Sequence, residues 1–236
     1  MFVLGLETAT ERVGVALGNS EGVRAAFEVT RGRRHAETMA PAIDLVCRQA
    51  DIDITEISVV AVDIGPGMFT GLRVGLATGK ALSQALDVPM IGLTSLELLA
   101  HPLRYSDGVI ASVMDGRKGQ VFYEFFRVED HDIRSVSEPT AGTVEDFLVA
   151  VNDRAQDVIC VGDGALVYHH EIENCRFAII ADHFLAYPSA GSLIQRVQAK
   201  VRREDWVAYT EISALYLRRP DAEINWATRA PQGAPL

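Results

Sequence analysis

Several features are scarce or missing in this sequence of 236 residues. Its three cysteines, Cys47, Cys160 and Cys175, form no CxxC pair, so we expect reduced thiols in a cytoplasmic protein and no disulfide framework. No apolar run approaches the roughly 20 residues that span a bilayer. The N-terminal segment reaches Glu7 without a basic leader, which predicts neither a membrane segment nor a secretion signal.

Basic residues are outnumbered: 22 Lys and Arg stand against 32 Asp and Glu, for a net charge of −10. Because neutralisation of phosphates dominates affinity for nucleic acids, the chain is poorly suited to hold RNA alone. Local basic clusters occur at residues 31–34, 202–203 and 218–219. Solvated or helix-end charges are the favoured interpretation of each cluster.

The common hydrolase and nucleotide-binding motifs are also missing. The six histidines form neither HxxxH nor HExxH, and the sequence has no GxSxG and no GxxxxGK[ST]. A zinc hydrolase needs two histidines on one helix face, and a serine hydrolase of the common α/β type needs the GxSxG turn. We therefore expect no metal and no cofactor.

The segment from Val59 to Ala100 carries the clearest positive signal. A strand over 59–62 enters a Gly-Pro-Gly loop, and the loop opens into a helix over about residues 71–86, with Thr70 as the expected N-cap. On a helical wheel the strongly polar side chains of this helix occupy one narrow arc. Its first apolar flank consists of Leu72, Gly75, Leu76, Gly79, Leu82 and Leu86, and its second of Val74, Ala77, Thr78, Ala81 and Ala85.

A helix that is apolar on two sides must be covered on two sides. One flank can pack on a sheet, and the other needs either a partner protein or a further element of the same domain. Gly75 and Gly79 each cost about 1 kcal/mol relative to alanine in a helix. Close approach of a second backbone would explain that cost, and the wheel alone leaves open whether it belongs to a partner.

An amphipathic helix is also predicted for residues 35–51. Its main stripe includes Met39, Ile43 and Val46, and a weaker stripe holds Thr38, Ala42 and Leu45. Pro41 lies in the second turn and is expected to kink the helix or delay its start. His35, at the head of the helix, is interpreted as a capping or interface residue.

The apolar pattern repeats at a spacing of about 100 residues. Strand, turn and strand over residues 2–17 are followed by VVAVDIGPG, and the same pattern over 109–126 is followed by VICVGDGAL. The repeat predicts two related α/β lobes, joined near residues 101–107. This pattern resembles the two RNase H-like lobes of the acetate and sugar kinase, Hsp70 and actin superfamily.

Two carboxylates, Glu7 and Asp63, lie at the ends of neighbouring predicted strands of the first lobe. In that superfamily, carboxylates at such positions hold a metal–nucleotide complex, so a residual nucleotide site is one interpretation; turn capping or pairing with arginine is the other. Asp115 in the second lobe is open to the same two interpretations. The candidate nucleotide-site residues of the first lobe are Glu7, Thr8, Asp63, Gly65 and Gly67.

Four strings, LGLETAT, RRHAETMAPAIDLV, DIGPGMFTGLRVGLATGKAL and VPMIGLTSLELLA, resemble the TsaB family. These are the shorter bacterial relatives of the catalytic TsaD proteins that make threonylcarbamoyladenosine on tRNA. In TsaD a metal-binding HxxxH follows the VPMIG-like strand. When the two sequences are aligned on Gly92 and Glu97, the two histidines of TsaD correspond to Ser95 and Leu99 in this chain. Serine is a poor metal ligand, and leucine cannot bind a metal.

The resemblance implies a non-catalytic subunit for threonylcarbamoyl transfer to adenosine 37 of tRNA. Such a subunit pairs with TsaD through the two helices, supports a TsaE-type ATPase, contacts tRNA only through the complex, and forms a homodimer when alone. The alternatives are a small-molecule kinase of the same superfamily and a glycoprotease-type peptidase. The predicted interface residues are His35, Thr38, Met39, Ala42, Leu45, Val74, Gly75, Thr78, Ala81 and Ala85.

The expected domain division is an N-terminal lobe over 1–106, which carries the partner-binding helices, and a C-terminal lobe over 107–236. The C-terminal lobe is expected to include a closing helix or strand–helix element near Ala208–Arg219 and a poorly ordered tail from about residue 221.

Overall fold

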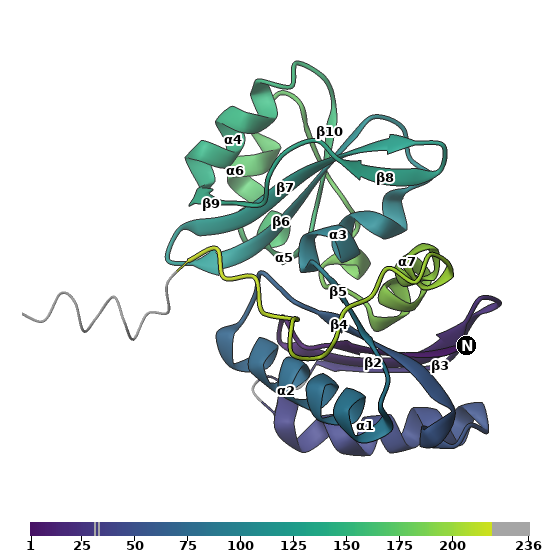
Figure 1. Cartoon of the computed structure of the whole chain (residues 1–236). Helices are drawn as coiled ribbons and strands as arrows, with labels where there is room; N and C mark the ends of the chain where they lie inside the picture. The colour runs from purple at the N-terminus through teal and green to yellow at the C-terminus, as the bar shows by residue number, and fades with distance from the viewer. Residues whose placement is uncertain (31, 33, 219–236) are drawn as a thin grey trace, which may run out of the picture.

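Two mixed β-sheets form the centres of two lobes in the computed structural model, which describes residues 1–30, 32 and 34–218 (Figure 1). The first sheet has the strand order β3-β2-β1-β4-β5, and the second has the order β11-β10-β6-β7-β8, with β9 beside β7. The strands of the first sheet are β1 (Phe2–Glu7), β2 (Arg12–Asn19), β3 (Gly22–Thr30), β4 (Ile57–Asp63) and β5 (Met90–Leu93). Those of the second are β6 (Val109–Arg117), β7 (Gln120–Glu129), β8 (Asp132–Ser135), β9 (Thr140–Thr143), β10 (Val158–Val161) and β11 (Ala178–Ile180).

The two sheets share one connectivity, which confirms the predicted repeat. In each lobe three antiparallel strands come first, and two later strands add in parallel beside the first of them. The fold is therefore the predicted pair of RNase H-like lobes. In the part of the chain that the structure describes, no helix is both long and apolar enough to cross a membrane.

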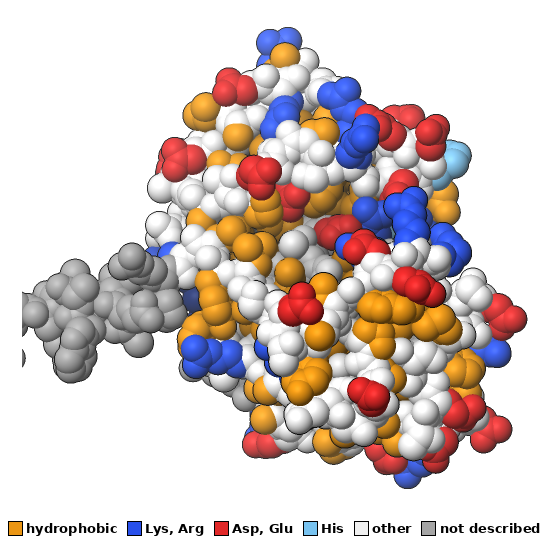
Figure 2. Space-filling view, in the orientation of Figure 1, with side chains coloured by type: hydrophobic (Ala, Val, Ile, Leu, Met, Phe, Trp, Pro, Cys, Tyr) orange, Lys and Arg blue, Asp and Glu red, His pale blue; other side chains and the backbone are white. Residues whose placement is uncertain are grey.

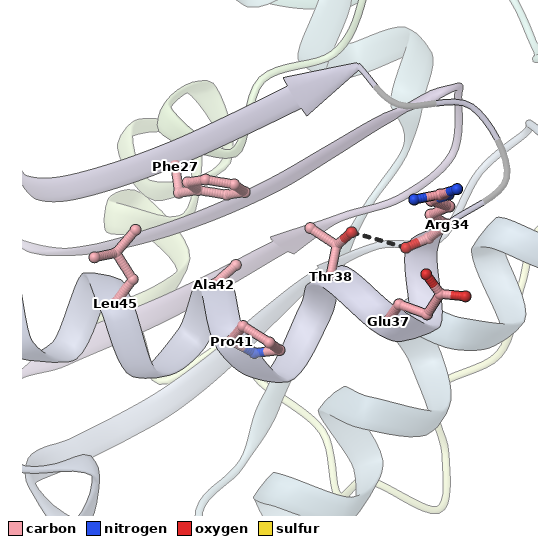
Figure 3. A pocket seen from close by; sticks show the side chains of 7 residues that line it. All are labelled: Phe27, Arg34, Glu37, Thr38, Pro41, Ala42 and Leu45. Carbon is pink, nitrogen blue, oxygen red and sulfur yellow. Dashed lines mark hydrogen bonds between the residues drawn. The ribbon is translucent and has the colours of Figure 1, made fainter.

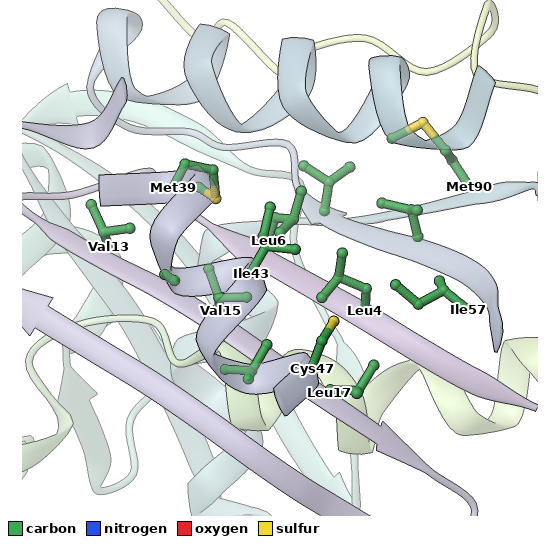
Figure 4. Packing of buried hydrophobic residues seen from close by; sticks show 14 of the residues in the cluster. Leu4, Leu6, Val13, Val15, Leu17, Met39, Ile43, Cys47, Ile57 and Met90 are labelled. Carbon is green, nitrogen blue, oxygen red and sulfur yellow. The ribbon is translucent and has the colours of Figure 1, made fainter. Parts of the chain in front are cut away.

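Helices cover both faces of the first sheet. Helices α1 (His35–Ala50) and α2 (Phe69–Leu86) lie on one face, and α7 (Ala190–Arg202) lies on the other (Figure 1). Because both faces are covered, the central strands are continuous apolar runs rather than alternating ones: Val3, Leu4 and Val60 are all fully buried. Figure 4 shows the side chains of Met39, Ile43 and Cys47 from α1 packed against those of β1 and β2.

Helix α1 begins at His35, so Pro41 in its interior does not delay its start. The His35 ring donates from Nε2 to the carbonyl oxygen of Thr10 (2.7 Å) and is 3% exposed, which joins the helix to the turn between β1 and β2. The helix ends at Ala50, and Asp51 follows in the left-handed conformation (φ 55°) that commonly stops a helix.

Helix α2 begins at Phe69, two residues earlier than expected, so the prediction of Thr70 as N-cap is wrong. The N-cap is Met68, which makes no side-chain capping bond. Its backbone N–H donates instead to the carbonyl oxygen of Ala9 (2.6 Å). The helix start is therefore placed by the neighbouring hairpin turn rather than by a local side chain.

The C-terminal part of the chain returns to the first lobe, which corrects the predicted extent of the second. Helix α7 packs on β1 and β2, although it lies beyond residue 107. The closing helix expected at 208–219 is not present among the described residues 208–218, which form an irregular strap. In that strap Ile212 is buried against the first lobe. The predicted tail from residue 221 lies outside the described residues.

The strap also touches the second lobe. Leu215 N–H donates to the carbonyl oxygen of Ile64 (2.7 Å) in the first lobe. Three residues later Arg218 donates to Gln120 Oε1 (2.9 Å) and to the carbonyl oxygen of Gly116 (3.3 Å) on the β6–β7 hairpin. The repeat pattern gave no sign of this contact, because the strap has no counterpart in the first half of the chain.

Candidate functional site

A groove of about 890 Å³ runs between α1 and α2 on the outer face of the first lobe. Its walls are mainly apolar, and an acidic and a basic side chain, Asp44 and Arg48, lie beside each other on α1 and form an ion pair (2.7 Å). The groove is lined by Ala40, Ile43, Asp44, Cys47, Arg48, Ile52, Asp53, Ile54, Ala77, Thr78, Ala81, Leu82 and Ala85.

The second flank of α2 faces outward. Ala77, Ala81 and Ala85 are exposed, while Val74 and Thr78 are half-buried. The first flank packs on the lobe's own sheet, where Leu72 and Leu76 are buried. The structure thus answers the question that the helical wheel left open: one flank is covered within the lobe, and the other is not covered by any described residue.

The glycines of α2 approach their own lobe and not a partner. A Cβ atom on Gly75 would overlap the hydroxyl oxygen of Thr8, and one on Gly79 would come within 2.9 Å of the Met90 methyl carbon. Gly75 therefore cannot belong to an exposed contact surface, and the prediction of it as an interface residue is corrected. The close approach inferred from the glycine spacing exists, but it is made by the turn after β1 and by β5.

Three of the five α1 residues predicted for the interface are also inside the lobe. His35, Met39 and Ala42 are 2–3% exposed, because the main stripe of α1 packs on β2 and β3. Thr38 and Leu45 are half-buried and line a second, smaller groove of about 300 Å³ between α1 and β3 (Figure 3).

Sequence reasoning missed the part of the large groove formed after α1. Ile52 and Ile54 line it, and Ile54 remains 38% exposed. The signal was present, since apolar residues continue past the helix in the segment ADIDIT. They do not follow the helical period, so the wheel did not include them.

The two carboxylates of the first lobe lie together in a closed interior. Glu7 and Asp63 are fully buried, at the ends of the adjacent strands β1 and β4. Glu7 Oε1 accepts from Ala9 N–H, and Asp63 Oδ1 accepts from Gly65 N–H and from Ser95 Oγ, each at 2.7 Å. The second oxygen of each carboxylate has no hydrogen-bond partner among the described residues.

Burial raises the pKa of both groups. For Glu7 the loss of solvent is the main cause, and the nearby Asp63 carboxylate raises its pKa further. For Asp63 the loss of solvent outweighs the two hydrogen bonds that lower its pKa. Two neighbouring buried carboxylates repel each other when both are ionised. The pair therefore favours the state in which at least one of the two carries a proton.

The nucleotide-site candidates are therefore brought together but enclosed. Thr8 is fully buried with its hydroxyl unpartnered among the described residues. A Cβ atom on Gly67 would overlap the carbonyl oxygen of Ala9. The loop and the start of α2 lie directly on the hairpin turn, because Met68 N–H donates to the carbonyl oxygen of Ala9.

A second, more open carboxylate pair occupies the matching place in the other lobe. Asp163 Oδ1, just after β10, accepts from Asp115 N–H (3.0 Å), and Tyr168 OH donates to Asp115 Oδ1 (3.2 Å). Burial raises the pKa of Asp163 to about 6. Sequence reasoning singled out Asp115 but not Asp163, although the repeat aligns the latter with the Asp63 region.

The positions aligned with the TsaD metal ligands are taken up by other contacts. Ser95 is fully buried and donates to Asp63. Leu99 is 2% exposed and packs in an apolar cluster with Leu72 and Ile110. Across the described ranges, no group of three or more His, Cys, Asp or Glu residues is arranged to hold a metal ion.

Comparison with known proteins gives one consistent answer. The family model described as TsaD, tRNA N6-adenosine threonylcarbamoyltransferase, matches residues 29–226. The TsaB protein of Bacillus subtilis is 27% identical over 174 residues, which is 74% of this chain and 76% of that protein. The TsaB protein of Escherichia coli is 30% identical over 135 residues, 56% of this chain and 58% of that protein.

The fold also matches a solved structure. A crystal structure from Pseudomonas aeruginosa, described as an uncharacterized protein with similarity to peptidase YEAZ, superimposes with a TM-score of 0.82. The match covers 92% of this chain and 99% of the other, at 22% identity. At that identity the likeness establishes the shared fold alone.

Proposed function

The chain belongs to the TsaD family, tRNA N6-adenosine threonylcarbamoyltransferase, and on that premise we propose that it is a non-catalytic subunit for threonylcarbamoyl transfer to adenosine 37 of tRNA. Its named relatives are TsaB proteins of tRNA threonylcarbamoyladenosine biosynthesis. The chain acts by pairing with a TsaD-like catalytic subunit, and a TsaE-type ATPase acts with the pair. The role of the ATPase rests on family membership.

The observation that carries the proposal is the uncovered groove between α1 and α2. Ala77, Ala81 and Ala85 present small apolar side chains along one line of α2, and the groove beside them has about 890 Å³. Small residues let another helix approach closely, and an amphipathic helix in such a groove is a recurring mode of recognition. The contact surface then consists of this groove, whose lining includes Thr78, Ile52 and Ile54, together with the half-buried Val74 one turn before Thr78.

A non-catalytic role is supported by the interior of the first lobe. Ser95 and Leu99 offer no pair of metal ligands, and Glu7 and Asp63 are closed off from solvent. A kinase of this superfamily needs carboxylates that a metal–nucleotide complex can reach, and a peptidase needs an accessible nucleophile or metal. Free protein covers the groove by forming a homodimer through the same helices, because an exposed apolar face of this kind favours association.

The proposal is tested by depletion and reconstitution. Loss of the protein lowers threonylcarbamoyladenosine in tRNA, measured by mass spectrometry of nucleosides, and the purified protein alone transfers nothing. Transfer appears only when a TsaD-type subunit is added with its ATPase and substrates. Normal modification after complete loss, with no substitute protein present, contradicts the role, and transfer by the isolated chain contradicts its non-catalytic character.

A further inference from the structure

Strand β3 forms one edge of the first sheet. On the side away from β2, no described residue pairs with its backbone. Strand β3 pairs with β2 on one side, from Gly22 to Thr30, with a β-bulge at Arg24, and it is the last strand in the sheet order. Its outward backbone N–H and C=O groups are therefore available to another strand. The nine residues contain no proline that would block such pairing.

An apolar groove lies beside this edge. It measures about 300 Å³, and Phe27 of β3 faces Ala42 and Leu45 of α1 across it (Figure 3). A strand added next to β3 would carry every second side chain into this groove, because side chains alternate between the faces of a sheet. The edge thus offers both main-chain partners and a place for side chains.

We propose that β3 pairs antiparallel with β3 of a second copy of this chain, with a twofold axis at Ala26. In that register Arg24 lies opposite Glu28 of the partner subunit, which is an attractive cross-strand pair. The twofold axis generates the same pair again. A twofold axis can pass through either kind of residue pair in an antiparallel ladder. The axis lies in the regular part of β3, Ala25–Thr30, and Arg24 borders it at the bulge.

The same register matches side chains by size. The small Ala25 lies opposite Phe27 of the partner subunit, on the face that packs toward α1. The large ring is thereby placed over a small residue and beside the groove lined by Leu45 and Pro41. Val23, which is 38% exposed, lies opposite Val29 of the partner subunit. The strand is therefore complementary to itself in charge and in volume.

The charged side chains are free to make the new contacts. Within the described part of the chain, Arg24 forms an ion pair with the neighbouring Glu21, at 3.4 Å, and both side chains are more than half exposed. Glu28 uses one oxygen to accept from Arg12 (3.2 Å), which leaves its other oxygen for a second arginine. Exposed pairs of this kind contribute little within the monomer, so exchanging them costs little.

A second copy is favoured over an unrelated peptide because β3 itself contains both members of each matching pair, Arg24 with Glu28 and Ala25 with Phe27. Dimerisation is measured by sedimentation equilibrium in the Ala81→Glu background, in which association through α1 and α2 is blocked. We expect a dimer that persists in this background. Adding Glu28→Arg places like charges opposite each other twice and weakens the dimer by about tenfold or more, and adding Arg24→Glu as well restores it.

Two further measurements separate the dimer from a folding effect. Arg12→Gln removes the partner of Glu28 within the chain, so it leaves the dimer as strong as before; the melting temperature of every variant is recorded. Amide hydrogen exchange at residues 22–30 slows as protein concentration rises. A monomer at every concentration in the Ala81→Glu background, or a dimer indifferent to Glu28→Arg, overturns the proposal. The proposal is also overturned if the protein with both Arg24→Glu and Glu28→Arg is folded but does not regain association.

Discussion

The backbone of α2 at Gly71 lies directly against the carbonyl oxygen of Thr8, so closely that a Cβ atom on Gly71 would overlap that oxygen. One turn later Gly75 meets the Thr8 hydroxyl in the same way. This contact closes the space between the β1–β2 turn and the helix start. The carboxylates behind it, Glu7 and Asp63, are consequently part of the core and not the floor of an open site.

Gly71→Ala is expected to destabilise the protein by about 2 kcal/mol, within the range for overpacking. Alanine is the better helix former, so a loss of stability isolates the effect of the contact with Thr8. In thermal unfolding the melting temperature falls by about 4–8 °C for a chain of this size. Ala77→Gly, on the exposed side of α2, serves as control and costs about 1 kcal/mol by propensity alone. A Gly71→Ala protein as stable as the parent contradicts the described contact.

Glu7→Gln is expected to change how stability depends on pH. Burial raises the pKa of Glu7 above its unfolded value, so the folded state binds the proton more tightly than the unfolded state. The stability from this group is present below the unfolded pKa and is lost as pH rises through the folded pKa. Glutamine keeps an oxygen for Ala9 N–H and has no charge to bury. Chemical denaturation from pH 4 to 8 then shows a gain for the variant that grows with pH.

The matched control for this series is Glu11→Gln, because Glu11 is exposed on the same turn. It is expected to leave the pH profile of the parent unchanged. If Glu7→Gln lowers the free energy of unfolding by the same amount at pH 8 as at pH 4, ionisation of Glu7 costs the folded protein little. The assignment of a raised pKa to Glu7 is then wrong.

Periodicity predicted the elements that are governed by neighbours in sequence. Helix α1 was placed at its observed start, and α2 within two residues, because each has an apolar stripe that repeats every three to four residues. The repeat of strand and turn patterns predicted both sheets. The helical wheel also predicts the second flank of α2, with Ala81 and Ala85, as a separate apolar surface.

Contacts between distant segments could not be predicted in this way. Helix α7 was not predicted from the sequence, and its place on the first lobe is set by its packing on β1 and β2. The glycine spacing in α2 indicates a close neighbour but not which one. Thr70 is a good capping residue by type, but the hydrogen bond from Met68 to Ala9 decides where the helix begins. Each error follows from a tertiary contact that prevailed over a local preference.

Arg196 is an instance of such a contact and supports a further prediction. From α7 it donates to Glu97 Oε1 (2.8 Å) on α3 (Ser95–Ala100), to Asp132 Oδ1 (2.5 Å) and to the carbonyl oxygen of Ile133 (3.3 Å). It therefore ties the first lobe to β8 of the second. We expect Arg196→Met to lower the free energy of unfolding by about 1–2 kcal/mol, because Glu97 loses a partner at a half-buried site.

The comparison variant is Arg134→Met, since Arg134 forms a more exposed ion pair with Glu129 on the same hairpin and is expected to cost under about 0.5 kcal/mol. Hydrogen exchange adds a local reading: Arg196→Met speeds exchange in β8 more than in β1. Equal effects of the two variants contradict the role of Arg196 between the lobes.

The purified protein is expected to bind no stoichiometric zinc or iron. Ser95 is engaged with Asp63, and Leu99 is buried among apolar side chains, so neither position supplies a ligand. Elemental analysis after dialysis checks this. About one tightly held transition metal per chain contradicts the expectation and directs attention to His101, His169 and His170.

We propose that the groove between α1 and α2 receives a TsaD-like subunit, and Ala81→Glu places a charge in the middle of that contact. Ala81 is exposed and lines the groove, so the variant melts like the parent. In the complex its carboxylate loses water without a partner, which costs several kcal/mol. By calorimetry with the TsaD-type subunit, we predict that affinity falls by about a hundredfold or more, while Val149→Glu, an exposed apolar position on α4 (Val144–Asn152), binds like the parent. A folded Ala81→Glu protein that binds as tightly as the parent contradicts the claim.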